Sequence, residues 1–274
     1  MNRRNIFAIA RKDWIEVRQN KYAWVPMLIL PILFDVVLPL IIILLMTNIQ
    51  MAPQSLTGDA DMEVFFRAMP PSISQFLDFS RPVELAIVVI LGYMLAPMFL
   101  MLPLMYSTTI AAESFAGERE RKTIEALLYT PATDTELFLG KVVASAVPSI
   151  LITWIGFGIY TLILNLVPYA VFQRVWFPLP TWWPLIFWMS PALVMFGICF
   201  TVLISEKVPT FLGAYQTSSA TVLIVVILFA GQMTGILYLS VGVGLLLGLL
   251  LWIIAAIMAF LAVRTFNREK LLTN

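Results

Sequence analysis

The chain has 274 residues, of which 61% are hydrophobic and 12% charged, and its formal net charge is +1. A soluble domain carries about 25% charged residues, so this composition excludes an ordinary soluble protein, and the near-neutral charge gives no reason to expect a nucleic-acid partner. The absence of histidine excludes every serine, cysteine or zinc site that depends on an imidazole group. The single cysteine, Cys199, lies in an apolar run, where we expect a small apolar filler, and no intrachain disulfide can form.

The first predicted element is an amphipathic helix over residues 3–21, in the N-terminal segment 1–22. Phe7, Ala10, Trp14 and Val17 share one face because steps of three and four residues return to the same side of a helix. The basic residues lie largely away from that face, as in helices that lie in the membrane interface. The alternative is that these charges only set the topology. A signal peptide is not favoured, because the apolar run that follows is too long and has no small-residue cleavage site.

Six long and nearly uncharged runs are each predicted to span a membrane, since roughly 20 apolar residues cross the hydrocarbon core. The second and third runs are longer than a bilayer requires, so they should tilt or project from it. The predicted fold class is an all-α membrane protein in which residues 1–274 form a single transmembrane domain. The predicted spans are 23–46, 83–112, 137–167, 183–204, 220–239 and 241–263.

The lysines and arginines predict the orientation of the chain. All but three of the 17 fall on one side of the predicted membrane. The exceptions are Arg67, Arg81 and Arg174. An excess of basic residues marks the cytoplasmic side, so we expect both termini in the cytoplasm and the chain in a cytoplasmic (inner) membrane.

Two segments on the opposite side have distinct compositions. Residues 47–82 are acidic and proline-containing, and Met62–Met69 is predicted to form a short helix on the membrane surface. Residues 168–184 combine prolines with aromatic residues, which favour the headgroup layer. We expect an aromatic belt there, and the alternative is an aromatic cage that binds a substrate. The aromatic residues are Tyr169, Phe172, Trp176, Phe177, Trp182 and Trp183.

One acidic residue, Asp35, lies in the middle of the first span. An aspartate at the centre of a bilayer costs roughly 2.5–3.5 kcal/mol, so Asp35 should face protein or water rather than lipid. Pro31 and Pro39 each free a backbone carbonyl from its helical hydrogen bond, which predicts a kinked and polar site at mid-depth. We interpret Asp35 as part of a translocation pathway that meets a cation or a polar headgroup. The alternative is a protonated aspartate that hydrogen-bonds to a neighbouring span.

The cytoplasmic segment 113–136, between the second and third spans, is densely charged. Glu118 and Lys122 have the spacing and order of a favourable helical ion pair. Pro131 ends this predicted helix, and residues 133–136 match a capping box in front of the third span. An apolar edge is formed by Ile124, Leu127 and Leu128. A rigid helix with one apolar edge suits docking against a partner protein.

The residues of this segment strongly resemble the permease (transmembrane) subunits of the type 2 ABC transporter family. The resemblance rests on ESFAGERERKTIEALL at 113–128, Thr130-Pro131 and Leu139-Gly140-Lys141. Arg11-Lys12-Asp13, the prolines of the first span and residues 205–216 are also similar to that family. Lys122 departs from the pattern, because glycine is common at its position.

This resemblance implies that the segment 113–136 carries a coupling helix, which contacts a separate P-loop ATPase subunit that binds ATP and Mg²⁺. The chain itself contains no GxxxxGK[ST] motif and implies no cofactor, metal or catalytic residue of its own. A second copy of the chain, or a homologous permease, would complete the pathway of an exporter. The residues implied in ATPase coupling are Glu113, Gly117, Glu118, Arg119, Arg121, Lys122, Thr123, Glu125, Leu127, Pro131 and Lys141.

Two other function classes fit the sequence less well. An ion-coupled secondary transporter or channel could use Asp35, but it would have no need of an ordered, charged docking loop. An intramembrane aspartyl protease needs two aspartates, whereas this chain has one at mid-membrane. Members of the resembling family differ in what they export, and the sequence does not select a substrate.

Overall fold

A computed structural model describes residues 3–48, 81–121, 123, 132–234 and 236–265 of the chain. This part of the chain is helical and contains no strand. The first half comprises α1 (Arg3–Gln19), α2 (Lys21–Pro31), η1 (Ile32–Val37), α3 (Leu38–Asn48), α7 (Pro82–Ile87), η2 (Val88–Met94), η3 (Pro97–Leu100), α8 (Met101–Ala112), η4 (Glu113–Gly117) and α9 (Glu118–Glu120). The second half comprises α11 (Asp134–Leu166), α12 (Tyr169–Phe172), α13 (Trp182–Pro184), η5 (Leu185–Met189), α14 (Ser190–Ser205), α15 (Phe211–Ser219), α16 (Val222–Met233) and α17 (Val241–Thr265).

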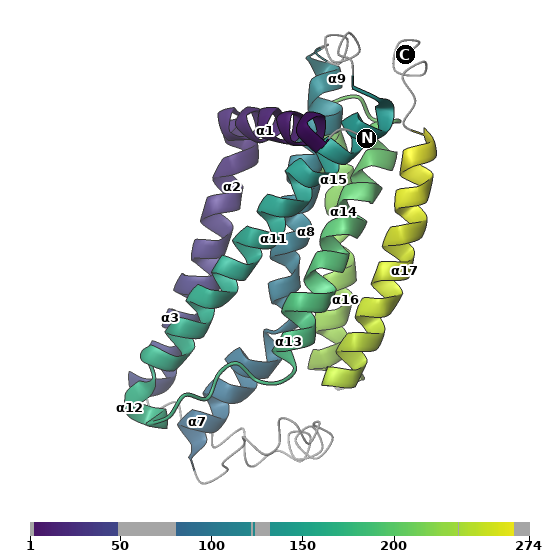
Figure 1. Cartoon of the computed structure of the whole chain (residues 1–274). Coiled ribbons are helices and arrows are strands. Elements are labelled where there is room, and N and C mark those ends of the chain that lie inside the picture. The colour runs from purple at the N-terminus through teal and green to yellow at the C-terminus, as the bar shows by residue number, and fades with distance from the viewer. Residues whose placement is uncertain (1–2, 49–80, 122, 124–131, 235, 266–274) are drawn as a thin grey trace.

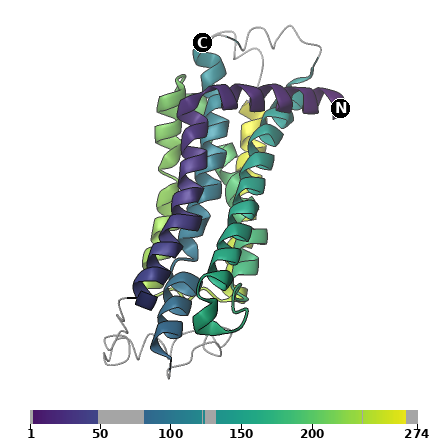
Figure 2. The same ribbon diagram turned by 90° about the vertical axis from the view of Figure 1, so that its left-hand side faces the viewer.

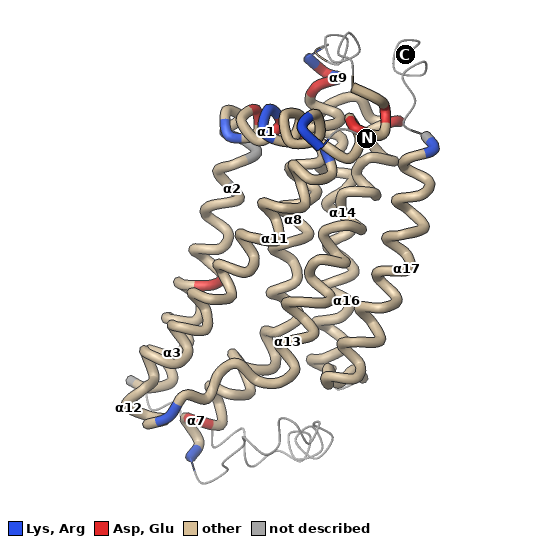
Figure 3. The backbone as a smooth tube through the Cα atoms, viewed as in Figure 1, with Lys and Arg blue, Asp and Glu red and all other residues tan. Residues whose placement is uncertain are grey.

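Six of the resulting rods are long and apolar enough to cross a membrane, which confirms the predicted number of spans. They run alongside one another as a bundle, and α1 lies across one end of it (Figure 1 and Figure 2). The candidate spans are Met27–Thr47, Pro82–Glu120, Asp134–Leu166, Trp182–Ser205, Phe211–Met233 and Val241–Arg264. Charged residues gather at the two ends of the bundle, and most densely around α1 and α9 (Figure 3).

The second and fifth spans have the limits that differ most from the predicted ones. The second rod continues past residue 112 through η4 and α9 and ends at Glu120. The fifth rod occupies Phe211–Met233 instead of 220–239, because residues 211–219, expected in a connection, form α15. The side chain of Thr210 caps that helix by accepting a hydrogen bond from the amide of Gly213. The hydroxyl of Thr217 bonds to the carbonyl of Gly213, so a polar sequence still forms a helix there.

The third span begins as the sequence predicts. The hydroxyl of Thr133 accepts a bond of 3.3 Å from the amide of Glu136, and the Glu136 carboxylate accepts one of 3.2 Å from the amide of Thr133. This reciprocal pair satisfies two of the free N–H groups that every helix start leaves. The cap therefore defines the first residue of the 33-residue helix α11.

The aromatic segment 168–184 is not a belt at the surface, and this prediction is wrong for most of its residues. Trp182 is fully buried, stacks on Tyr160 with 5.3 Å between ring centroids, and donates to the carbonyl of Gly92 at 2.6 Å. Trp176 is also buried and donates to the carbonyl of Leu164 at 2.8 Å. These indoles pack in the core because each N–H finds a backbone acceptor inside the bundle. Tyr169 and Trp183 remain exposed.

Trp182→Ala should lower the free energy of unfolding by about 3–5 kcal/mol, because it removes a fully buried indole and its hydrogen bond. Trp183→Ala is the matched control, since its neighbouring indole is 52% exposed and should cost much less. Unfolding in detergent can be followed through the reactivity of the buried thiol of Cys199. Equal losses in the two variants would show that the segment does not pack as described.

Candidate functional site

Three separate parts of the chain meet where α1 crosses the end of the bundle. The second rod arrives there as η4 and α9, and the third rod begins there as α11. Their polar side chains form one connected group, which we refer to as the charged junction. Its members are Asn5, Lys12, Asp13 and Glu16 of α1 with Asn20 directly after it, Glu113, Ser114 and Glu118 of the second rod with Arg121 directly after it, and Glu136 and Lys141 of α11.

The ammonium group of Lys141 lies at the centre of the junction and is 1% exposed. It donates to Oε2 of Glu118 at 2.6 Å, to the carbonyl oxygen of Ser114 at 2.6 Å and to Oδ2 of Asp13 at 3.3 Å. Asp13 also accepts a hydrogen bond from the hydroxyl of Ser114. Lys141 thus joins α11 to α1 and to the end of the second rod at once.

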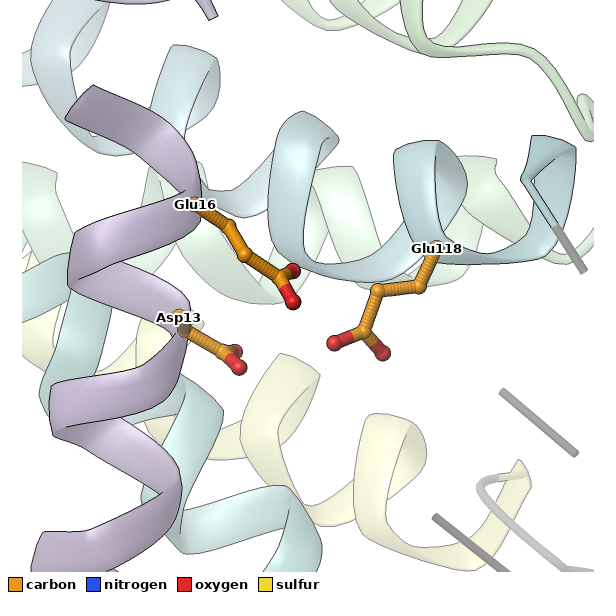
Figure 4. A group of neighbouring side chains, drawn as sticks. All are labelled: Asp13, Glu16 and Glu118. Carbon is orange, nitrogen blue, oxygen red and sulfur yellow. The ribbon is translucent and has the colours of Figure 1, made fainter. Parts of the chain in front are cut away.

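Three carboxylates converge beside this lysine, as Figure 4 shows for Asp13, Glu16 and Glu118. The ammonium group of Lys12 pairs with all three: with Glu118, with Glu16 at 3.0 Å and with Asp13 at 3.6 Å. Three acids this close would suit a divalent cation. Here, however, Lys12 and Lys141 already supply the positive charge, so the geometry favours an ion-pair network over a metal site.

Two further contacts tie the ends of α1 to its neighbours. The side-chain amide of Asn20 donates to Oε2 of Glu113 at 2.7 Å, and that of Asn5 donates to Oε2 of Glu136 at 3.1 Å. The other oxygen of Glu113 accepts from the guanidinium of Arg121 at 2.6 Å. The whole length of α1 is therefore bonded to the bases of the second and third rods.

The other side of α9 is bonded to the connection between the fourth and fifth rods. Arg119 donates to the carbonyl oxygen of Ser205 at 2.6 Å, at the end of α14. The carboxylate of Glu120 accepts from the backbone amide of Phe211 at 2.8 Å, at the start of α15. A displacement of α9 would therefore act on four rods and on α1.

The close approach of α1 to α11 depends on a glycine. A Cβ atom at Gly140 would lie 2.7 Å from Cγ2 of Ile9 and 3.2 Å from the carbonyl oxygen of Ile6. Any side chain there would move α1 away from the third rod. Gly140 directly precedes Lys141. The residue whose small size lets α1 approach α11 is therefore next to the residue whose side chain binds α1.

The electrostatics of the junction favour the charged forms of Lys12 and Arg121. Burial alone would lower the pKa of Lys12, but the nearby carboxylates of Glu118, Asp13 and Glu16 raise it above its usual value. Burial would likewise lower the pKa of Arg121, and the hydrogen bond and attraction from Glu113 raise it. A raised pKa of a cation contributes stability that is fully present below its unfolded value and is lost only as the pH rises through the folded value.

The structure divides the predicted coupling residues into three groups. Glu113, Gly117, Glu118 and Lys141 are buried in this structure. Arg119 is half-buried, whereas Arg121 and Thr123 are exposed. The predicted residues Lys122, Glu125, Leu127 and Pro131, with the apolar edge Ile124 and Leu128, lie outside the described residues, as does the predicted helix Met62–Met69.

The α1 half of the junction, of which Asp13 is the central member, was not predicted from the sequence. A signal was present, because Asp13 lies three residues after Ala10 and four before Val17, on the face predicted to be buried. An acid on a buried helix face indicates a buried cation. The face itself is rotated from the prediction: Ile9, Ala10, Asp13 and Val17 are buried, and Phe7 is 67% exposed.

Asp35 forms a second and separate site within the bundle. It lies in the π-helical segment η1 between Pro31 and Pro39 and is 1% exposed. In the described part of the chain, neither of its carboxylate oxygens has a hydrogen-bond partner. The carboxylate fits against Gly156 of α11, where a Cβ atom would clash with it. The hydroxyl of Tyr106 in α8 also has no hydrogen-bond partner in the described residues.

Comparison with known proteins adds one finding. A family model described as ABC-2 family transporter protein matches residues 7–268, which include the charged junction and all six candidate spans. No curated protein and no solved structure matches the chain.

Lys141→Ala should lower the free energy of unfolding by about 3–5 kcal/mol, because it removes the buried partner of two buried carboxylates and leaves them with Lys12 alone. Lys207→Ala removes an exposed lysine near the same end of the bundle and should have little effect. Thermal unfolding in detergent, followed through the thiol of Cys199, measures both.

A double variant tests whether the loss arises from the ion pair. Adding Glu118→Gln to Lys141→Ala should recover part of the lost stability, since it removes one of the negative charges that Lys141 helped to balance. Strictly additive losses would contradict the network.

Proposed function

The chain belongs to the family of ABC-2 transporter proteins, and from this premise we propose that it forms the translocation pathway of an ATP-driven exporter powered by a separate ATPase subunit. The family and the six apolar helices establish a membrane permease of an ABC transporter. Export, the ATPase, and the pairing with a second copy or a homologous permease are parts of the proposal. A closed two-fold pair is the simplest arrangement for two such chains.

The charged junction is the observation that carries this proposal. Its bonds join α1, α9, α11 and the connection at 205–211 into one unit at the end of the bundle. A helix of 39 residues is about 58 Å long, so the second rod extends well beyond a hydrocarbon core about 30 Å thick. A force on this projecting end would tilt the second and third rods together, because Lys141 fastens one to the other.

The coupling residues then take two different roles. Arg121 and Thr123 are exposed, and with Lys122, Glu125, Leu127 and Pro131 they would contact the ATPase. The buried set would pass the movement inward: Glu113, Gly117, Glu118 and Lys141. Arg119 would extend the movement to α14 through its bond to Ser205.

ATP and Mg²⁺ would bind to the partner, because this chain contains no phosphate-binding motif. The distribution of lysine and arginine supports an orientation in which the charged junction and both termini are cytoplasmic, in an inner membrane. A cytoplasmic junction is where a soluble ATPase can reach it.

Asp35 would line the pathway. A buried acid with no partner in the described residues is costly within a span and is retained mainly for function. This observation also favours a second candidate function, an ion-coupled secondary transporter or channel. That alternative would use Asp35 without an ATPase.

Gentle purification of the tagged chain from its native membrane should recover a P-loop ATPase in equal amount. Glu125→Lys should abolish this association, because it reverses a charge in the proposed contact segment. Arg264→Glu reverses an exposed charge at the end of α17 and should leave the association intact. A folded chain that purifies alone in good yield would instead support the ion-coupled alternative.

Thiol labelling tests the role of Asp35 without knowledge of the substrate. In a Cys199→Ala background, Asp35→Cys should react with a charged, membrane-impermeant thiol reagent during turnover. Ile32→Cys, at an exposed apolar position of the same span, should not react. Arg174→Cys provides a reactive reference. Reaction at residue 174 with none at residue 35 would exclude Asp35 from the pathway.

A further inference from the structure

An open groove of about 530 Å³ lies between α1 and α11. This volume is within the range of about 300–1,000 Å³ that is typical of ligand sites. One wall includes Phe7, Arg11 and Trp14 of α1, and the other includes Ala144, Val147 and Leu151 of α11. None of these residues belongs to the charged junction.

Except for Arg11, both walls of the groove are apolar, and several of their side chains are exposed. Phe7 is 67% exposed, Val147 48% and Leu151 49%. Because α1 crosses the end of the spans (Figure 2), the groove lies where a bilayer changes from headgroups to acyl chains. Such walls suit a hydrocarbon chain.

Arg11 is the charged residue of the groove, and no acid neutralises it among the described residues. Arg11 is exposed. The acids of α1, Asp13 and Glu16, point into the charged junction, where Lys12 and Lys141 pair with them. The groove therefore combines an apolar cleft with an uncompensated positive charge.

We propose that this groove binds an anionic phospholipid of the leaflet on the junction side, with its phosphate on Arg11 and an acyl chain along Val147 and Leu151. A guanidinium forms paired, charge-assisted hydrogen bonds with phosphate. Basic pockets between membrane helices bind anionic headgroups in this way. The lipid holds α1 from the side opposite to the ion pairs, so α1 is fixed by protein on one face and by lipid on the other.

The test measures the lipid that stays bound to the full chain, together with any subunit that copurifies. The protein is reconstituted in nanodiscs of phosphatidylglycerol and phosphatidylcholine, extracted in mild detergent, and its retained lipid is quantified by native mass spectrometry. Arg11→Gln should lower the retention of phosphatidylglycerol about five-fold, which corresponds to about 1 kcal/mol for one basic residue at an anionic surface. Arg18→Gln removes an exposed charge from the same helix outside the groove and should leave retention unchanged.

A second pair of variants tests the apolar wall. Val147→Trp fills the groove from its exposed side and should displace the lipid, whereas Ile155→Trp alters an exposed position of α11 outside the groove. Equal effects of the two arginine variants would show only general attraction to a basic helix and would overturn the proposal. So would equal retention of the two phospholipids, or an unchanged signal in Val147→Trp. The readout is independent of ATPase binding, so it can fail while the proposed function holds.

Discussion

A lysine ammonium group buried at the end of an apolar bundle must be neutralised, and much of the structure at this end depends on how that is done. Lys141 finds its partners on two other elements, Asp13 of α1 and Glu118 of α9. Removing an ion from water costs several kcal/mol, which only close partners with satisfied hydrogen bonds can offset. The position of α1 and the position of the end of the second rod are therefore set together. A shift of either one would take a carboxylate away from the buried ammonium group of Lys141.

Because of this constraint, the elements at this end of the bundle are linked into one unit. The connection at 205–211 joins the same unit through Arg119 and Glu120, so the bases of the second to fifth rods are linked by hydrogen bonds. Because α1 contributes its acids to the junction, its opposite face keeps the free charge of Arg11. The same pairing that makes the junction rigid thus leaves a basic, apolar groove toward the bilayer.

Among the described residues, two kinds of buried acid can be distinguished. Glu113, Glu118 and Asp13 are paired with cations or hydroxyl groups, and they hold the elements together. Asp35 has no partner in the described residues and lies in a π-helical segment that two prolines flank. Segments of this type interrupt regular helices frequently at functional sites. The paired acids at the end of the bundle therefore have a structural role, whereas the role proposed for Asp35 at its middle is functional.

The sequence by itself determined the six spans, the capping box at Thr133 and Glu136, the charged segment after the second span and the family, because hydropathy, caps and motifs are local patterns. Only the tertiary structure decided that Lys141 binds Asp13, a residue 128 positions away, and that the tryptophans at 176 and 182 enter the core. It also decided that residues 211–219 extend a span. Such outcomes depend on which donors and acceptors the fold brings together, and a hydropathy pattern has no information on partners distant in the chain.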